Sequence, residues 1–188
     1  ESSRCKVDEI TVGAVMNASA KVGDVERVEH YLQEMPGRGL TPNVVCYNTV
    51  LHACAQSGDP VRGLKWFKEL LAAGLQPNKI SFNSLIDAYM KVGDALSAEQ
   101  WLIAMVNRGI DVDTITYFTL TRDYQQMHKH CAIQEASKWA FGVILKTYAA
   151  AGNTRAIQYW LGQMSQEGLS LSTQQMEDCL RGALGHVQ

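Results

Sequence analysis

The residues of this 188-residue chain that could do chemistry are few. His128, His130 and Cys131 are able to bind metal, but adjacent helical residues point in different directions and no fourth ligand has a suitable spacing. The sequence has no glycine-rich phosphate loop, no H-E-x-x-H motif and no nucleophile elbow. Four aspartates fall on different helix faces or turns rather than in one cluster: Asp87, Asp94, Asp111 and Asp113. We therefore expect no catalytic residue, metal site or cofactor.

The composition favours a folded protein that binds its partner by shape and hydrogen bonding. Hydrophobic residues make up 46% of the chain and the net charge is only −2, which excludes a disordered tail. No apolar stretch approaches the roughly 18 residues that span a bilayer, so we expect no membrane segment. No basic face is evident that would attract nucleic acid by charge alone.

The cysteines and the chain ends point to the cellular context. The five cysteines are an odd number without a C-x-x-C pair, which is typical of a reducing compartment. The chain begins at Glu1 rather than at Met and closes at Gln188, as a fragment or a processed product would. A targeting peptide would then not be visible in it.

The elements that position the polar residues follow an internal repeat of 35 residues. Gly23, Gly58 and Gly93 are spaced by this interval. Other columns keep the same spacing: Gly39, Gly74 and Gly109; Met35, Leu70 and Met105; Leu40, Leu75 and Ile110; Tyr31, Trp66 and Trp101. Agreement over several columns indicates a repeat array.

Each repeat unit has the pattern of two helices. Tyr47, Val50, Leu51 and Cys54 form an apolar stripe on one helix face. Gly58 ends that helix, and a second amphipathic pattern follows. A hairpin of this size cannot bury its apolar face alone, so the units must stack. The sequence therefore predicts an all-α fold, an α-solenoid of antiparallel helical hairpins with a 35-residue repeat and a curved inner surface.

The repeat predicts the domain boundaries. Residues 1–8 are an N-terminal remnant, residues 9–172 are the array, and residues 173–188 form a C-terminal capping helix running from Thr173 to about Ala183. The units are 9–43, 44–78, 79–113, a degenerate 114–141, and 142–172. The spacing breaks near Trp139. Either the helices merge into one rod from about Ala132 to Ala150, or a loop is missing from the sequence there.

Residues 44–51 and the segments from Gly58 through Asn78 resemble the pentatricopeptide repeat family. Residues 80–89 match nearly as well. Tetratricopeptide repeats differ, because their period is about 34 residues and their W-x₂-L-G-x₂-Y pattern does not occur here. The resemblance is strong over residues 44–113, good over 9–43 and 142–172, and poor over 118–141.

The resemblance implies single-stranded RNA binding in mitochondria or plastids, with one base read by each repeat. In this family the fifth and last residues of a repeat read the base. Carried onto this chain, Asn48 pairs with Asn78, which implies a pyrimidine, and Asn83 pairs with Asp113, which implies uracil. The first repeat offers only half of a reading pair, because Gly13 stands opposite Asn43.

The resemblance also implies apolar wedges between the bases and contacts to phosphate. The wedges are the second residues of the repeats: Ile10, Val45, Ile80 and Ile115. Lys21 and Lys91 take the position at which the family places a phosphate-contacting lysine. The fourth repeat instead has Phe118 at its reading position, and the fifth pairs Gly142 with Ser172. We expect weak RNA affinity for this chain alone.

Several alternatives remain open. Asn48 and Asn83 could be helix N-caps, since Asn is favoured there, and their truncation should cost little stability. Three tryptophans could stack on bases, but their positions in second helices predict that they belong to the core between repeats: Trp66, Trp101 and Trp160. The whole chain could be a protein-interaction scaffold or an organellar ribosome-associated subunit. It could also be the targeting part of an enzyme whose catalytic domain lies elsewhere.

Overall fold

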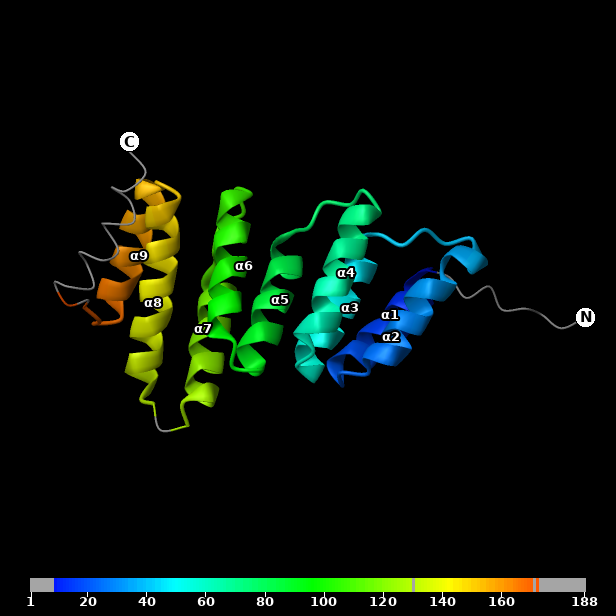
Figure 1. Ribbon diagram of the computed structural model, residues 1–188, viewed down its shortest axis with the longest axis horizontal. Coiled ribbons are helices and arrows are strands. Elements are labelled where there is room, and N and C mark those ends of the chain that lie inside the picture. Colours follow the sequence, from blue (N-terminus) through cyan, green and yellow to red (C-terminus); the bar gives the residue numbers. More distant parts are fainter. Residues whose placement is uncertain (1–8, 130, 171, 173–188) are drawn as a thin grey trace, which may run out of the picture. The chain divides into compact units, whose positions relative to one another are not determined.

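The computed structural model describes residues 9–129, 131–170 and 172, with backbone only for residues 9 and 10. Its described residues form helices and no strand (Figure 1). In chain order the helices are α1 (Glu9–Lys21), α2 (Val25–Glu34), a 3₁₀ helix η1 (Pro36–Arg38), α3 (Val44–Ser57), α4 (Pro60–Ala72), α5 (Lys79–Lys91), α6 (Ala95–Asn107), α7 (Thr114–Met127), α8 (Ile133–Ala150) and α9 (Thr154–Gln166).

The repeat spacing is visible in where the helices begin. Helices α3, α5 and α7 begin at residues 44, 79 and 114, so their starts are 35 residues apart. Gly58 ends α3 with a φ of 66°, in the left-handed region that favours glycine. Asp59 then caps α4, whose first residue is Pro60. Local backbone chemistry therefore determines the length of each hairpin.

Residues 1–92 belong to the first of two compact units. Within this unit α3 packs against α1 and α5 on either side and against its hairpin partner α4. Phe67 of α4 meets Phe82 of α5 edge-on, with ring centroids 5.2 Å apart. A Cβ atom on Gly63 would lie 3.1 Å from the side chain of Leu85, so glycine allows α4 and α5 to approach closely. The first helices thus form one layer and α2 and α4 pack beside it.

Residues 93–188 belong to the second unit, in which α8 is central. Helix α8 packs against α6, α7 and α9. It is a single helix across the place where the sequence spacing breaks, which agrees with the merged-rod alternative. Phe141 of α8 packs between Tyr117 and Trp160, with ring-centroid distances of 4.6 Å and 6.0 Å. These aromatic rings form the core of the second unit.

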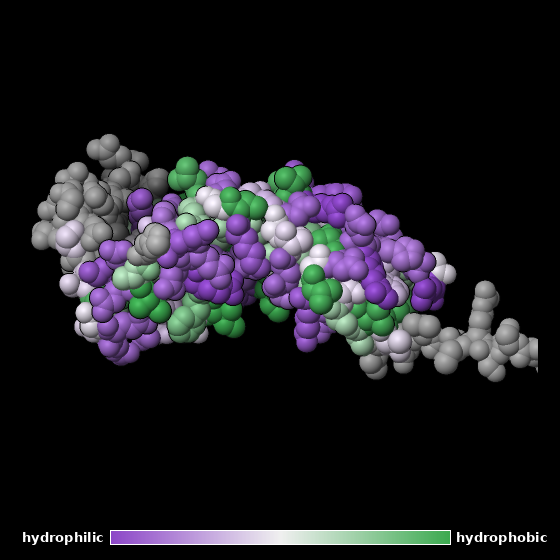
Figure 2. All heavy atoms as spheres, turned by 90° about the horizontal axis from the view of Figure 1, so that it is seen from below, coloured by the Kyte–Doolittle hydropathy of each residue, from purple (hydrophilic) through white to green (hydrophobic). Residues whose placement is uncertain are grey.

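The fold is all-α over the described part of the chain, and two predicted segments lie outside it. The remnant 1–8 and the capping helix from Thr173 to Ala183 are not among the described residues. None of the described helices combines the length and apolar character needed to cross a bilayer. On the face shown in Figure 2, apolar side chains form several small patches among hydrophilic ones.

Candidate nucleic-acid interface

The last residues of the first three predicted repeats cap the first helices of the repeats that follow them. Asn43, Asn78 and Asp113 have extended backbones, and their side chains accept hydrogen bonds from backbone N–H groups in the first turns of α3, α5 and α7. The alternative that Asn48 and Asn83 are the N-caps is wrong, because both lie five residues into their helices. Capping therefore holds one member of each predicted reading pair in place.

Asn48 and Asn78, the predicted readers of the second repeat, are hydrogen-bonded to each other. Asn48 Nδ2 donates to Asn78 Oδ1 at 3.0 Å. Asn78 Oδ1 also accepts from the backbone N–H groups of Ile80 and Ser81, at 3.0 and 3.2 Å. The Ser81 hydroxyl donates to Asn48 Oδ1 at 2.6 Å. The two amides thus form one network at the start of α5.

The network determines which end of each amide is available. Both carbonyl oxygens accept hydrogen bonds within the protein, so the available groups are the N–H donors of Asn48 and Asn78. Asn78 is exposed, whereas Asn48 is only 5% exposed. The expectation that Asn48 could be truncated at little cost does not hold, because its buried amide has two side-chain partners. The pair therefore offers donors, mainly from Asn78.

The other predicted readers are Gly13 on α1, Asn83 on α5, and the caps Asn43 and Asp113. Gly13 is exposed on α1 and has no atom near its Cβ position, so it contributes no side chain opposite Asn43. Asn83 is half-buried on α5 in the first unit. Asp113 belongs to the second unit, where its carboxylate accepts from Thr116 N at 3.0 Å. The pairing of Asn83 with Asp113 stays a prediction.

The predicted wedges are exposed where their side chains are described. Val45, Ile80 and Ile115 are 65%, 59% and 65% exposed. Each is the second residue of its helix, two residues after the cap. The side chain of Ile10 lies outside the described residues. Single exposed apolar residues are common on proteins, but these three recur at one repeat position and could contact flat base faces.

The two predicted phosphate-binding lysines differ. Lys21 is exposed at the end of α1. Lys91 donates from Nζ to the backbone oxygen of Ala55 at 2.8 Å and to Asp87 Oδ2 at 3.1 Å. The ion pair is largely buried, with side chains 22% and 11% exposed. A phosphate would have to compete with Asp87 for Lys91, so the role of Lys91 stays a prediction.

His52 lies near this ion pair. Burial lowers the pKa of His52; Asp87 partly opposes the shift, whereas Lys91 and Lys21 add to it. The sequence alone assigned no binding or positioning role to His52, Asp87 or Ser81. Asp87 stands four residues before Lys91, a signal for a helical ion pair. Ser81 stands three residues after Asn78, the spacing of a capping box.

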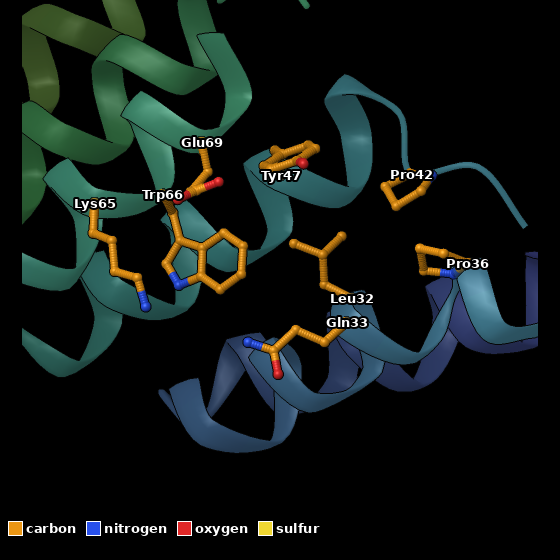
Figure 3. Close-up of a pocket in the computed structure, with 8 residues that line it drawn as sticks. All are labelled: Leu32, Gln33, Pro36, Pro42, Tyr47, Lys65, Trp66 and Glu69. Carbon is orange, nitrogen blue, oxygen red and sulfur yellow. The ribbon is translucent and has the colours of Figure 1, made fainter. Parts of the chain in front are cut away.

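A separate cavity of about 320 Å³ lies beside α2, α3 and α4 (Figure 3). Trp66 and Tyr47 both line this cavity. The centroids of their two rings are 6.2 Å apart. Trp66 is only 6% exposed and donates its indole N–H to Glu29. Trp160 is 2% exposed. The predicted core position is therefore confirmed for Trp66 and Trp160, whereas Trp101 is only half-buried. Trp66 and Trp160 are therefore not base-stacking platforms.

The cysteine and metal-capable residues form no reactive site in the part of the chain described. Burial raises the pKa of the Cys54 thiol to about 12, which makes it unreactive near neutral pH. His130 lies outside the described residues. Among the rest, no three His, Cys, Asp or Glu side chains are grouped so that they could hold a metal ion.

Two family models match this sequence. The one described as pentatricopeptide repeat domain matches residues 3–57 and 30–92. The one described as PPR repeat family matches residues 77–124. Together they extend over well more than half of the 188 residues. No curated protein matches the chain.

Solved structures share the fold. The pentatricopeptide repeat protein PPR10 in complex with an 18-nucleotide psaJ RNA element is 18% identical with a TM-score of 0.61, covering 92% of this chain and 26% of PPR10. PPR10 from maize alone gives 23% identity and a TM-score of 0.57, covering 94% of this chain and 27% of that one. The chain thus spans about a quarter of PPR10.

A third structure is similar over nearly its whole length. It is the pentatricopeptide repeat domain of the Arabidopsis thaliana protein-only RNase P 1 in complex with tRNA. Its identity is 17% and its TM-score 0.52, and the match covers 93% of this chain and 97% of that domain. These similarities confirm the predicted all-α helical-repeat solenoid class.

Proposed function

Because the chain belongs to the pentatricopeptide repeat family, we propose that it binds single-stranded RNA in a mitochondrion or plastid and acts in RNA processing, stability or translation. The bound segment would be held single-stranded, and so protected or presented to another factor. The solved relatives with RNA bound support an RNA partner. Catalysis by these residues themselves is not part of the proposal.

The observation that carries the proposal is the Asn48–Asn78 pair. Its carbonyl oxygens are occupied, and its outward groups are N–H donors held by a capped helix start. Cytosine has two adjacent acceptors, N3 and O2, on its Watson–Crick edge, whereas uracil has an N3–H donor between two acceptors. A donor-only pair therefore favours cytosine within the pyrimidines that the family resemblance implies.

The wedges complete the proposed base site. Val45 lies at the start of α3 and Ile80 at the start of α5, each beside one of the caps and more than half exposed. A base hydrogen-bonded to Asn78 would lie between these apolar side chains. Stacking on them would add affinity without sequence preference, so discrimination would come from the amide pair.

The experiment exchanges the outward donor for an acceptor. Asn78→Asp keeps an oxygen for the cap and for Asn48, but replaces Nδ2 by a second oxygen. We expect the wild type to prefer an alternating C–U 10-mer over oligo(U) by about tenfold. Asn78→Asp should reverse this ratio, because the second repeat would then carry the same Asn/Asp pair as the third. Fluorescence anisotropy at low salt measures both affinities.

The control is Asn43→Asp, which adds the same charge at the same repeat position opposite Gly13. It should weaken binding to both strands equally and leave their ratio unchanged. Equal binding of wild type to both strands would contradict the assignment of the pair. Absence of any binding to single-stranded RNA at low salt would instead favour the alternative that the chain is a protein-interaction scaffold.

The second candidate function, a protein-interaction scaffold or ribosome-associated subunit, is favoured by one observation. The ammonium group of Lys91 is neutralised by Asp87, and the chain has a net charge of −2. A surface on which only one of the two predicted phosphate ligands is available attracts RNA weakly. Such a surface would suit a protein partner, which needs no excess of positive charge.

A further inference from the structure

Ser81 holds a central place in the network around the amide pair. It is the third residue of α5 and completely buried. Its hydroxyl oxygen accepts the backbone N–H of Asn78 at 3.1 Å. Its single hydrogen can serve one acceptor, and Asn48 Oδ1 at 2.6 Å is much closer than Asn78 Oδ1 at 3.3 Å. The hydroxyl therefore donates to Asn48.

This donation determines the orientation of the Asn48 amide. The two ends of an Asn amide have nearly the same shape, so only hydrogen-bond partners decide which one faces which neighbour. Ser81 supplies a donor to the oxygen end, and Asn78 Oδ1 supplies an acceptor to the nitrogen end. Without the hydroxyl, the buried oxygen of Asn48 would lose its partner, and the amide would be free to turn or shift.

We infer that Ser81 is a specificity-determining positioning residue for the base read by Asn48 and Asn78. The inference rests on the proposed RNA-binding function. It means that base recognition in one repeat depends on the third residue of the following repeat, thirty-three residues along the chain from Asn48. Ser81 itself is buried and does not touch the base; it acts by keeping the donor end of Asn48 toward Asn78.

The sequence of this chain gives independent support. The third residues of three successive repeats are Cys46, Ser81 and Thr116. A hydroxyl occurs in the repeats that follow Asn48 and Asn83, whereas Cys46 stands in the repeat that follows Gly13, which has no side chain to orient. Hydroxyl-bearing residues thus stand at this position in the two repeats that follow an Asn at the reading position.

The test compares Ser81→Ala with Ser81→Thr in the whole chain. The probes are the alternating C–U 10-mer and oligo(U), and the measured quantity is the ratio of their affinities. Ser81→Ala should reduce the preference of about tenfold to about twofold or less, because Asn48 is no longer held. Ser81→Thr keeps a hydroxyl and should retain the ratio within about twofold. Thermal unfolding of each variant shows that binding is measured on folded protein.

A purely structural role for Ser81 predicts another result. Loss of the capping contact would then weaken binding to both strands by the same factor and leave the ratio unchanged, and that result overturns the inference. If the wild type discriminates between the strands and Ser81→Ala does so equally, only the role of Ser81 fails. If the wild type binds neither strand, the proposed function fails and the inference fails with it.

Discussion

Asn48 combines a structural role with its proposed recognition role in one buried amide. Its oxygen accepts from Ser81 and its nitrogen donates to Asn78, and both partners belong to the start of the next first helix. A buried amide with partners at both ends contributes to stability, whatever its part in recognition. A variant at Asn48 that bound RNA less tightly could therefore have lost either its fold or its base contact, and a binding measurement would not separate the two. Asn78, which is exposed, is the better position for a functional test.

His52 makes stability depend on pH. Burial lowers its pKa in the folded state below the ordinary value of 6.5, with added contributions from Lys91 and Lys21. The unfolded chain therefore binds a proton at a higher pH than the folded chain does. We expect the free energy of unfolding to fall as the pH drops through 6.5 and to level off below the folded-state pKa.

Urea unfolding of wild type and His52→Gln between pH 7.5 and 5 measures this effect. The variant should lose this part of the pH dependence, because Gln does not titrate. His30→Gln is the control, since the side chain of His30 is 66% exposed. A His52→Gln profile parallel to that of wild type would contradict the assignment.

At the scale of the elements, side-chain caps mark where most of the described helices begin, although α8, which follows Ala132, has none. Asp24, Asp59 and Asp94 each accept from a backbone N–H in the first turn of a second helix. Asn43 and Asn78 do the same for first helices. Each cap is worth about 1 kcal/mol. Because the caps recur with the repeat, the helix starts are spaced more regularly than packing alone would require.

Helix α8 is held at its C-terminal end by Tyr148. This tyrosine is 1% exposed, and its hydroxyl accepts from the buried backbone N–H of Val112 at 2.8 Å. We expect Tyr148→Phe to destabilise the protein by about 1–3 kcal/mol, since the N–H of Val112 loses its partner. Chemical denaturation monitored by circular dichroism measures the loss.

The control for this prediction lies on the neighbouring helix. Tyr159 of α9 is 55% exposed, and Tyr159→Phe should change stability by less than about 0.5 kcal/mol. Equal stabilities of Tyr148→Phe and Tyr159→Phe would show that the Val112 contact contributes nothing.

At the scale of the whole molecule, charge would limit the affinity of the proposed RNA binding. The net charge is −2, and of the two predicted phosphate ligands only Lys21 lacks a close ion-pair partner in the described part of the chain. Each phosphate contact to a single strand contributes about 0.7 to the slope of log affinity against log salt. We expect a shallow slope of about −1 between 50 and 200 mM salt, roughly one to two contacts.

Replacing Asp87 tests this charge argument. Asp87→Asn removes the competitor for Lys91, so it should raise RNA affinity and steepen the slope by about 0.7. Adding Lys91→Gln to Asp87→Asn should remove both gains. A slope near −4 in the wild type would mean that other cations carry the binding.

The amino-acid sequence by itself determined the all-α class, the 35-residue spacing and the helix starts. These features depend on residues close together in the chain: an Asn or Asp cap, a glycine in the left-handed region, and an apolar stripe along one helix. Family resemblance then identified Asn48 and Asn78 as a candidate pair. Local signals sufficed for these features because caps, glycine turns and apolar stripes are set by residues close in the chain, even though the hairpins bury their apolar faces only by stacking.

Tertiary structure alone decided how those residues are used. The orientation of the Asn48 amide depends on Ser81 and Asn78, and the engagement of Lys91 depends on the backbone oxygen of Ala55, a partner thirty-six residues away. The segment in which the repeat spacing breaks is part of one continuous helix, α8, which packs against α6, α7 and α9. Such outcomes depend on angstrom-scale distances between stacked helices, which a repeat pattern does not contain.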